Sequence, residues 1–392
     1  MIKMSLNFED YNIHIEAENN QYIITESKLF IGLREIKNFQ CKALVYLPTK
    51  VIEQPHMYLF IDSYKMYNYL LKLHKFKLNI KSTLPKNEVL YMKNLRVKEG
   101  NFDISGTQKG YILVHFPKFA FKYTTNIPIK CNKITFRISD SELLKSAINQ
   151  YPEYRIEIID LEHLGIKSIK TDEQIENNLL HIEFVDNIDS YYLFMKNVKP
   201  IIELILYLTS FAERRRLTWS SFTCSDCIEH YNCRRVFNQD KKVYRLVSDE
   251  VFNKFLSTSL QRIQFNEIGY YLSILNLIVT ANKYPTNIKI ILFNTALETI
   301  LKKRFDKKRD KYKVELINKL NIITFDIEKI KDMIDIRNSI THGDEVSSRK
   351  QFKFSNSWQI LLERMVLNEL GWGDLSMTDV NYVKGNYVLG LV

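Results

Sequence analysis

A polar segment near the end of the chain combines two side chains that together can break a phosphodiester bond without a metal. It runs from Arg337 to Gly343 and reads RNSITHG. A histidine such as His342 can move a proton at neutral pH. An arginine such as Arg337 can hold a phosphate through two parallel hydrogen bonds and stabilise the charge that develops on it. The spacing of these residues therefore predicts general acid–base chemistry on a phosphate.

These residues fall at the end of a segment, 325–342, whose pattern predicts a helix. Its apolar residues recur at spacings of three and four and share one face, and they are Ile327, Ile330, Met333, Ile334 and Ile340. Gly343, just past the last turn, is a typical helix stop. Arg337 lies within the apolar face, where an arginine requires a carboxylate, a phosphate or a partner chain.

A second strip of the same helix carries Asp335, Asn338 and His342 at spacings of three and four. We expect Asn338 to contact His342, with Asp335 orienting either of them. At a helix C-terminus the helix dipole favours the charged imidazolium, which suits a general acid. A solvated helix end with a capping histidine would show the same spacing, so this alternative stays open.

Two segments resemble HEPN domains. Residues 335–343 read DIRNSITHG, like the signature of that family, and residues 293–301 read FNTALETIL, like the helix that precedes it. The resemblance implies a helical bundle that dimerises, and many such domains are metal-independent endoribonucleases of toxin–antitoxin, CRISPR and phage-defence systems. A long β-rich half followed by such a domain resembles the ApeA-like abortive-infection proteins, although this part of the likeness rests on architecture.

The resemblance implies roles for three residues. Arg337 would bind the phosphate and stabilise the transition state, His342 would be the acid or base, and Asn338 would support them. Positions five apart on an ideal helix point about 140° away from each other. The resemblance therefore implies a two-fold homodimer that places two copies of the segment face to face.

The function implied in this way is RNA cleavage by attack of the ribose 2′-hydroxyl on its own phosphate, leaving a 2′,3′-cyclic end, in anti-phage abortive infection. The RNA is unspecified, with tRNA as one candidate, and the β-rich half would bind a phage-derived trigger. The alternative is a non-catalytic HEPN module that dimerises or binds RNA or protein.

The charge of the chain is compatible with a polyanionic partner. Its 392 residues include 56 Lys and Arg against 45 Asp and Glu, for a net charge of +11 and a pI near 9.1. Residues 302–313 read KKRFDKKRDKYK. This run predicts RNA-binding residues, but a solvated loop explains it equally well; the candidates are Lys302, Lys303, Arg304, Lys307, Lys308 and Arg309. For a shorter run, Arg214–Arg216, we favour the solvated loop.

Glu298 lies four residues before Lys302 on the helix that precedes the basic run. A surface ion pair with Lys302 is the default interpretation. The less favoured alternative places Glu298 opposite Arg337.

A cysteine-rich stretch carries the second chemical pattern, C-x2-C-x2-H-x2-C, formed by Cys224, Cys227, His230 and Cys233. Three thiolates and an imidazole complete the tetrahedral shell of a structural zinc ion, which is the favoured interpretation. A ligand from elsewhere, an iron–sulfur cluster, a disulfide and free thiols remain alternatives. A disulfide is disfavoured in a reducing cytoplasm.

The remaining pattern predicts an α+β protein with two domains, a β-rich domain over 1–245 and an all-α HEPN bundle over 246–392. Short strand-like runs occur before residue 190, with Cys41 and Cys131 among them as buried small hydrophobes; examples of these runs are 21–25, 42–47, 111–116, 133–138 and 154–159. A helix follows at about 191–215. Further helices are expected at about 249–261, 265–283, 287–305, 310–320, 325–342 and 353–371, with Ser355–Ser357 as a start or a break.

Localisation is predicted from two absences in the sequence. The first residues contain no signal-peptide apolar region. The longest apolar stretch, 200–212, is interrupted by Glu203 and is too short to span a bilayer. We therefore expect a cytoplasmic protein without a membrane partner.

Overall fold

The chain is folded into two compact units that alternate along the sequence. The computed structural model describes residues 3–8, 13–18, 22–31, 34–46, 56–72, 78–83, 88–115, 119–124, 131–138, 141, 143–144, 162–174, 177–188, 194–224, 228–232, 245–247, 249–305 and 327–372. The sheet unit comprises residues 1–140, 171–190 and 218–238. The helical unit comprises residues 141–170, 191–217 and 239–392.

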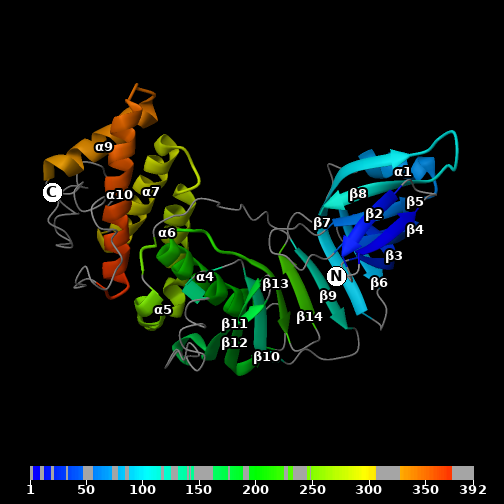
Figure 1. Ribbon diagram of the computed structural model, residues 1–392, viewed down its shortest axis with the longest axis horizontal. Helices are drawn as coiled ribbons and strands as arrows, with labels where there is room; N and C mark the ends of the chain where they lie inside the picture. Colours follow the sequence, from blue (N-terminus) through cyan, green and yellow to red (C-terminus); the bar gives the residue numbers. More distant parts are fainter. Residues whose placement is uncertain are drawn as a thin grey trace. The chain divides into compact units, whose positions relative to one another are not determined.

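Fourteen strands are described (Figure 1), and all of their pairings whose register is known are antiparallel. Their bounds are β1 Lys3–Phe8, β2 Ile13–Glu18, β3 Tyr22–Ile31, β4 Arg34–Tyr46, β5 His56–Ile61, β6 Leu78–Thr83, β7 Glu88–Phe102, β8 Gly110–His115, β9 Phe119–Thr124, β10 Cys131–Ile138, β11 Ile166–Gln174, β12 Asn177–Ile188, β13 Trp219–Cys224 and β14 Ile228–Asn232. Strands β1 and β2 form a two-stranded sheet, and the other twelve are hydrogen-bonded in the order β11-β12-β10-β13-β14-β9-β7-β6-β3-β4-β5-β8.

Six strands of the large sheet close into a ring, because β7 pairs with β8 as well as with β6. The period of two along a strand explains which residues point inward. On β5, Met57, Leu59 and Ile61 belong to the buried core of the ring, together with Ile112 and Val114 of β8. Helix α1, Tyr64–Lys72, contributes Leu70 to the same core.

The strands beyond the ring bury a second set of apolar side chains. Phe136 of β10 stands opposite Phe222 of β13, and their ring centroids are 5.4 Å apart. Trp219 meets both rings edge-on, at 5.9 Å from Phe136 and 5.8 Å from Phe222. Aromatic pairs of this geometry add to the stabilisation from burial.

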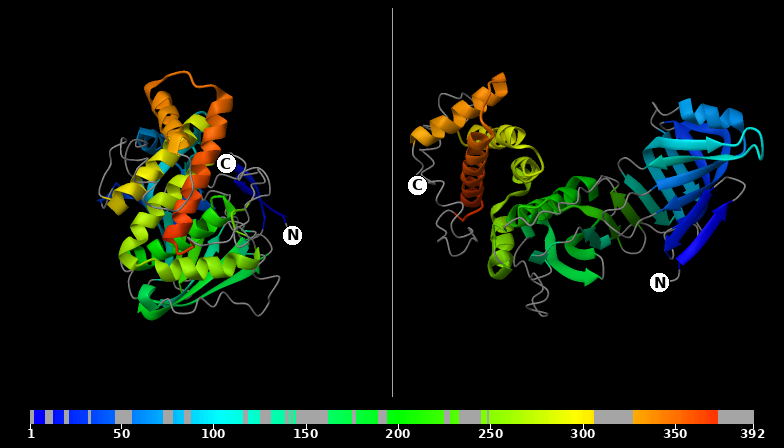
Figure 2. Two further views of the ribbon diagram at one scale, coloured as in Figure 1. Left: turned by 90° about the vertical axis from the view of Figure 1, so that its left-hand side faces the viewer. Right: turned by 45° about the horizontal axis from the view of Figure 1, so that its top comes forward.

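The helical unit is built from helices of α4 and beyond. A 3-10 turn, Glu162–Leu164, and a π-helical turn, Phe194–Val198, precede α4. The bounds of the helices are α4 Lys199–Glu213, α5 Asp249–Arg262, α6 Ile268–Ala281, α7 Thr286–Phe305, α9 Ile327–His342 and α10 Ser348–Glu369. A 3-10 turn, Phe265–Glu267, precedes α6. Helix α4 packs on α5 and α6, α7 packs on α6 and α10, and α9 contacts α7 and α10 (Figure 2).

Helix α10 differs from its sequence-based expectation. It begins at Ser348, with the Ser347 hydroxyl accepting a hydrogen bond from the Lys350 N–H at 3.4 Å. The predicted start or break at Ser355–Ser357 is wrong. Both serines are buried within the helix, and their hydroxyls donate to the carbonyls of Phe352 and Lys353. Serine hydroxyls satisfied in this way do not interrupt a helix.

The predicted α+β class is confirmed, with sheets preceding a C-terminal helical region. Four of the five strand-like runs match β3, β4, β8 and β10, whereas the run 154–159 and the expected helix 310–320 lie outside the described residues. The single boundary after residue 245 does not separate the compact units, because α4 packs with α5 and α6. Of the helices described, none has the length and apolar character required to cross a bilayer.

Candidate active site in the helical unit

The end of α9 is fixed by a specific hydrogen-bonding motif. The Asp344 N–H donates to the Ser339 carbonyl at 2.9 Å, and the Gly343 N–H donates to the Ile340 carbonyl at 3.4 Å. Gly343 has φ +85°, in the left-handed region that this motif requires of the residue after the helix. The predicted glycine stop is therefore confirmed, and His342 is the last residue of α9.

Arg337 is held between two helices. Its Nη2 lies 3.6 Å from Glu298 Oε1 on α7, and its Nη1 donates to Asn338 Oδ1 at 2.8 Å. The Arg337 side chain is 21% exposed. Its neighbours Met333, Ile334 and Ile336 are buried, as a position on the apolar side of α9 requires.

Glu298 therefore lies opposite Arg337, which was the less favoured of the two sequence-based interpretations. The favoured one was a surface ion pair with Lys302. Asn294, one turn earlier on α7, donates from Nδ2 to Glu298 Oε1 at 2.9 Å and fixes the carboxylate. Asn294 is 1% exposed and was missed as a site residue. Its spacing of four from Glu298 on a predicted helix was the available signal.

The histidine is placed differently from expectation. His342 is exposed, and its side chain makes no hydrogen bond or ion pair within the described part of the chain. The expected contact with Asn338 is not formed, because the Asn338 carbonyl binds the Arg337 guanidinium, a charged and therefore stronger donor. Asp335 is exposed and likewise makes no bond to His342 among these residues.

The basic candidates are only partly described. Lys302 is exposed on α7. Lys303 donates to Glu267 Oε1 at 2.6 Å, which lowers the pKa of that carboxyl group, and its Nζ lies 3.9 Å from the centre of the Tyr270 ring. Lys303 is thus bound to the start of α6. The side chain of Arg304, and all of Lys307, Lys308 and Arg309, lie outside the described residues.

The Arg214–Arg216 run is not a solvated loop, so that interpretation is wrong. Arg214 ends α4 with φ +53° and is 2% exposed. Its Nε and Nη2 donate to Glu363 Oε1 and Oε2 of α10, at 2.8 and 2.5 Å. Gln359 donates to the same carboxylate at 2.8 Å and accepts from Lys289 Nζ at 3.0 Å. A buried arginine is stable here because a carboxylate neutralises it.

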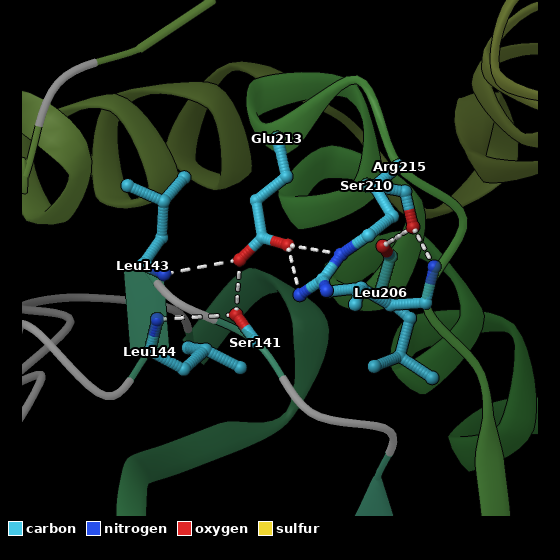
Figure 3. Close-up of polar contacts among 8 residues, drawn as sticks. Ser141, Leu143, Leu144, Leu206, Ser210, Glu213 and Arg215 are labelled. Carbon is cyan, nitrogen blue, oxygen red and sulfur yellow. Dashed lines mark hydrogen bonds and ion pairs between the residues drawn. The ribbon is translucent and has the colours of Figure 1, made fainter. Parts of the chain in front are cut away.

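The residues flanking Arg214 form a second buried network (Figure 3). Glu213 Oε1 accepts from the Ser141 hydroxyl at 2.5 Å and the Leu143 N–H at 3.0 Å, and Oε2 accepts from Arg215 Nη2 at 3.0 Å. Burial raises the pKa of Glu213, while Arg215 and the hydrogen bonds act in the opposite direction. The Ser210 hydroxyl accepts from the Leu217 N–H at 2.8 Å, which holds the chain against α4 beyond its last turn.

The cysteine cluster is described only at its edges. Cys224 ends β13, is buried and is disulfide-bonded, so the expectation that a disulfide is absent from this cluster is wrong for Cys224. His230 lies on β14, opposite Phe222 of β13. The side chain of His230 lies outside the described part of the chain, as do Cys227 and Cys233. Because a cysteine binds zinc as a thiolate, Cys224 can bind zinc only in the reduced protein. No group of three potential metal ligands occurs among the described side chains.

Two cysteines, Cys41 and Cys131, lie outside the cysteine-rich stretch. Cys41 is buried in the core of the ring, as predicted. Cys131 begins β10, and its side chain is not among those described.

In comparisons with known proteins, no protein family, no curated protein and no solved structure matches this chain. The HEPN resemblance therefore rests on the sequence of residues 335–343 and 293–301.

Proposed function

We propose that this protein is a metal-independent endoribonuclease of the HEPN type that acts in the cytoplasm in anti-phage abortive infection. One observation carries the proposal. Arg337, which is paired with Glu298 of a neighbouring helix, lies near the same helix end as the exposed His342, and these are the residue types that stabilise phosphate charge and transfer a proton in phosphodiester cleavage.

The residues would divide the reaction between them. The ribose 2′-oxygen attacks phosphorus and the bond to the 5′-oxygen breaks, leaving a 2′,3′-cyclic phosphate and a 5′-hydroxyl. His342 transfers the proton, accepting it from the 2′-hydroxyl or donating it to the leaving 5′-oxygen. Arg337 stabilises the charge on the phosphoryl oxygens, and Asn338 and Glu298 fix the guanidinium plane.

A homodimer would supply both proton-transfer roles. Arg337 and His342 diverge on α9, so one chain does not present them side by side. The exposed apolar residues Ile288 and Ile291 of α7, and Tyr284 just before it, support a partner at this helix. Ile291 lies seven residues before Glu298, on the same side of the helix, so this strip leads towards the Arg337 pair. The sheet unit would bind the phage-derived trigger.

The test is to sequence RNA ends after incubating purified protein with cellular RNA in EDTA. We expect new 5′-hydroxyl and 2′,3′-cyclic phosphate ends with the wild-type protein and none with His342→Ala. Asp332→Asn is the control, because Asp332 is exposed on the same helix, five residues before Arg337. Cleavage by His342→Ala at the wild-type rate would exclude the assignment.

A non-catalytic HEPN module is the second candidate. It is favoured by the contacts of Arg337, which would give this residue a structural role, and by the lack of a described side chain orienting His342. This candidate predicts a dimer that binds RNA but leaves it intact, and that is harmless when overproduced. Light scattering together with RNA-end sequencing distinguishes the two.

A further inference from the structure

The first turns of α10 carry a strip of exposed side chains, Arg349, Phe352 and Lys353, called the α10 strip below. Spacings of three and four place these residues on one face of the helix. Phe354 and Trp358 are buried and lie on the opposite face. The α10 strip therefore belongs to the face of this helix that does not contribute to the core.

The aromatic ring of the strip is not explained by packing. Phe352 is 63% exposed, whereas Phe354, two residues later, is 6% exposed. Phenylalanine is not a strong helix former, so an exposed ring here adds little to the stability of α10. A single exposed aromatic side chain is common on protein surfaces. What distinguishes Phe352 is that one cation lies three residues before it and another directly after it.

The cations at the start of α10 have no acidic partner among the residues that the structure describes. Arg349 and Lys353 are exposed, as is Lys350 beside them, and none of the three forms an ion pair there. Asp344 and Glu345, in the loop before the helix, are also exposed and do not pair with these cations. An anionic partner would therefore find positive charge that no described carboxylate neutralises.

The α10 strip lies near His342. Helix α9 ends at His342 and α10 begins at Ser348, and a short loop joins them (Figure 1). The Asp344 N–H of this loop donates to the Ser339 carbonyl, which holds the loop against α9. Even if fully extended, the loop spans at most about 22 Å. One nucleic-acid strand can therefore contact His342 and the strip together.

The chemistry of the strip fits single-stranded nucleic acid. Arginine and lysine bind backbone phosphates, and an exposed aromatic ring beside them can stack on an unpaired base. The bases of a duplex are already stacked on one another and are not accessible to such a ring. A membrane surface would require several apolar side chains to enter the bilayer, and the strip offers one. An acidic peptide would use the cations and leave the ring without a specific partner.

We propose that the α10 strip binds single-stranded RNA, with an unpaired base stacked on Phe352 and the adjoining phosphates bound by Arg349 and Lys353. The choice of RNA rests on the proposed ribonuclease function, which places the cleaved phosphate at the end of α9. The strip would then select substrates that have an unpaired base a short distance from the cut, as in a loop or a single-stranded end.

The test measures binding of a fluorescent RNA oligonucleotide to the full-length protein by anisotropy. The oligonucleotide carries 2′-O-methyl groups, so it stays intact whether or not the protein is a ribonuclease. Phe352→Ala should weaken binding about tenfold, the effect expected for the loss of one base stack. Phe352→Tyr keeps an aromatic ring and should bind as the wild type does. Inorganic polyphosphate has no bases, so it should bind Phe352→Ala and the wild type equally.

The salt dependence of binding separates the cations from the ring. Arg349→Gln combined with Lys353→Gln should reduce the slope of log affinity against log salt concentration by up to about 1.4, because each phosphate contact on a single strand contributes about 0.7. Phe352→Ala should leave this slope unchanged. The matched control is Arg262→Gln combined with Phe265→Ala, an exposed arginine three residues before an exposed phenylalanine. The control should change neither the affinity nor the slope.

Loss of RNA affinity in Phe352→Ala that Phe352→Tyr restores, with no loss for polyphosphate, supports the site. Unchanged RNA affinity in Phe352→Ala, an equal loss for polyphosphate, or an equal loss in the control overturns it. The ribonuclease proposal fails separately. Cleavage of cellular RNA by a protein whose binding does not depend on Phe352 overturns the α10 strip alone. Binding that depends on Phe352, by a protein that leaves RNA intact, supports the strip and contradicts the ribonuclease.

Discussion

Replacing His342 by alanine should separate catalysis from stability. The side chain is exposed and makes no described hydrogen bond, so its removal deletes no packing. The stabilising effect that the substitution would remove is the interaction of the His342 side chain with the α9 helix dipole. We expect the free energy of unfolding to change by less than about 1 kcal/mol. Loss of a general acid or base should lower the cleavage rate by about 10²–10⁴-fold.

Arg337→Ala should lower both the cleavage rate and the free energy of unfolding. The charges of Arg337 and Glu298 are 3.6 Å apart, and the two side chains are 21% and 33% exposed. At an effective dielectric constant near 20 the attraction is about 5 kcal/mol, but solvent screening and desolvation reduce the net contribution of such a pair to about 1 kcal/mol. Arg337→Lys keeps the charge but loses the planar fork, so it should recover stability without recovering cleavage.

The assay uses the same preparations for urea unfolding, followed by circular dichroism, and for RNA cleavage under single-turnover conditions. Glu298→Gln is the companion variant, since it removes the charge from the other side of the pair. If His342→Ala cuts RNA at the wild-type rate, or if its free energy of unfolding falls by more than about 1 kcal/mol, the division of roles is refuted.

Three further predictions concern the buried charges and the cysteines. Arg214→Met leaves the Glu363 carboxylate buried without its partner and should lower the free energy of urea unfolding by about 3–5 kcal/mol. Adding Glu363→Leu should recover part of the lost stability. Strictly additive losses in the double variant would contradict a coupled pair. Burial lowers the pKa of Lys289 from 10.5 to about 8. Between about pH 8 and 10.5 the unfolded chain therefore binds more protons at this residue than the folded protein does. The free energy of unfolding should rise with pH across this window by up to about 3 kcal/mol. A Lys289→Met protein with the same pH profile would exclude that cause. Elemental analysis should find about one zinc per chain in reduced protein and none where Cys224 is in a disulfide, and a reduced, folded, metal-free protein would show that the cluster does not bind zinc.

The sequence predicted well those features that depend on neighbours along the chain. The helix ending at His342 follows from apolar spacing and from Gly343, and the observed hydrogen bonds at Ser339 and Ile340 agree. Four of the strands and most of the described helices were located for the same reason, since their periodicity is local.

Partners that come from distant parts of the chain were not predictable in this way. Glu298 was assigned to a lysine four residues away, because the packing of α7 on α9 is invisible in the local pattern. The three arginines after α4 read as one solvated run. Arg214 instead takes φ +53°, the chain turns there, and each arginine meets a different partner. The bond between Asn338 and Arg337 likewise depends on competition between donors that spacing does not reveal.

The alternation of the two units has a consequence for how this protein can be made and divided. The chain passes between the sheet unit and the helical unit five times, at 140/141, 170/171, 190/191, 217/218 and 238/239. A cut after residue 245 would separate α4 from α5 and α6, and Arg214 from Glu363. During synthesis α4 therefore emerges well before the helices that cover it, and the helical unit completes its core only when α10 leaves the ribosome. A single proteolytic cleavage or gene truncation at that point would divide the core of the helical unit between two fragments.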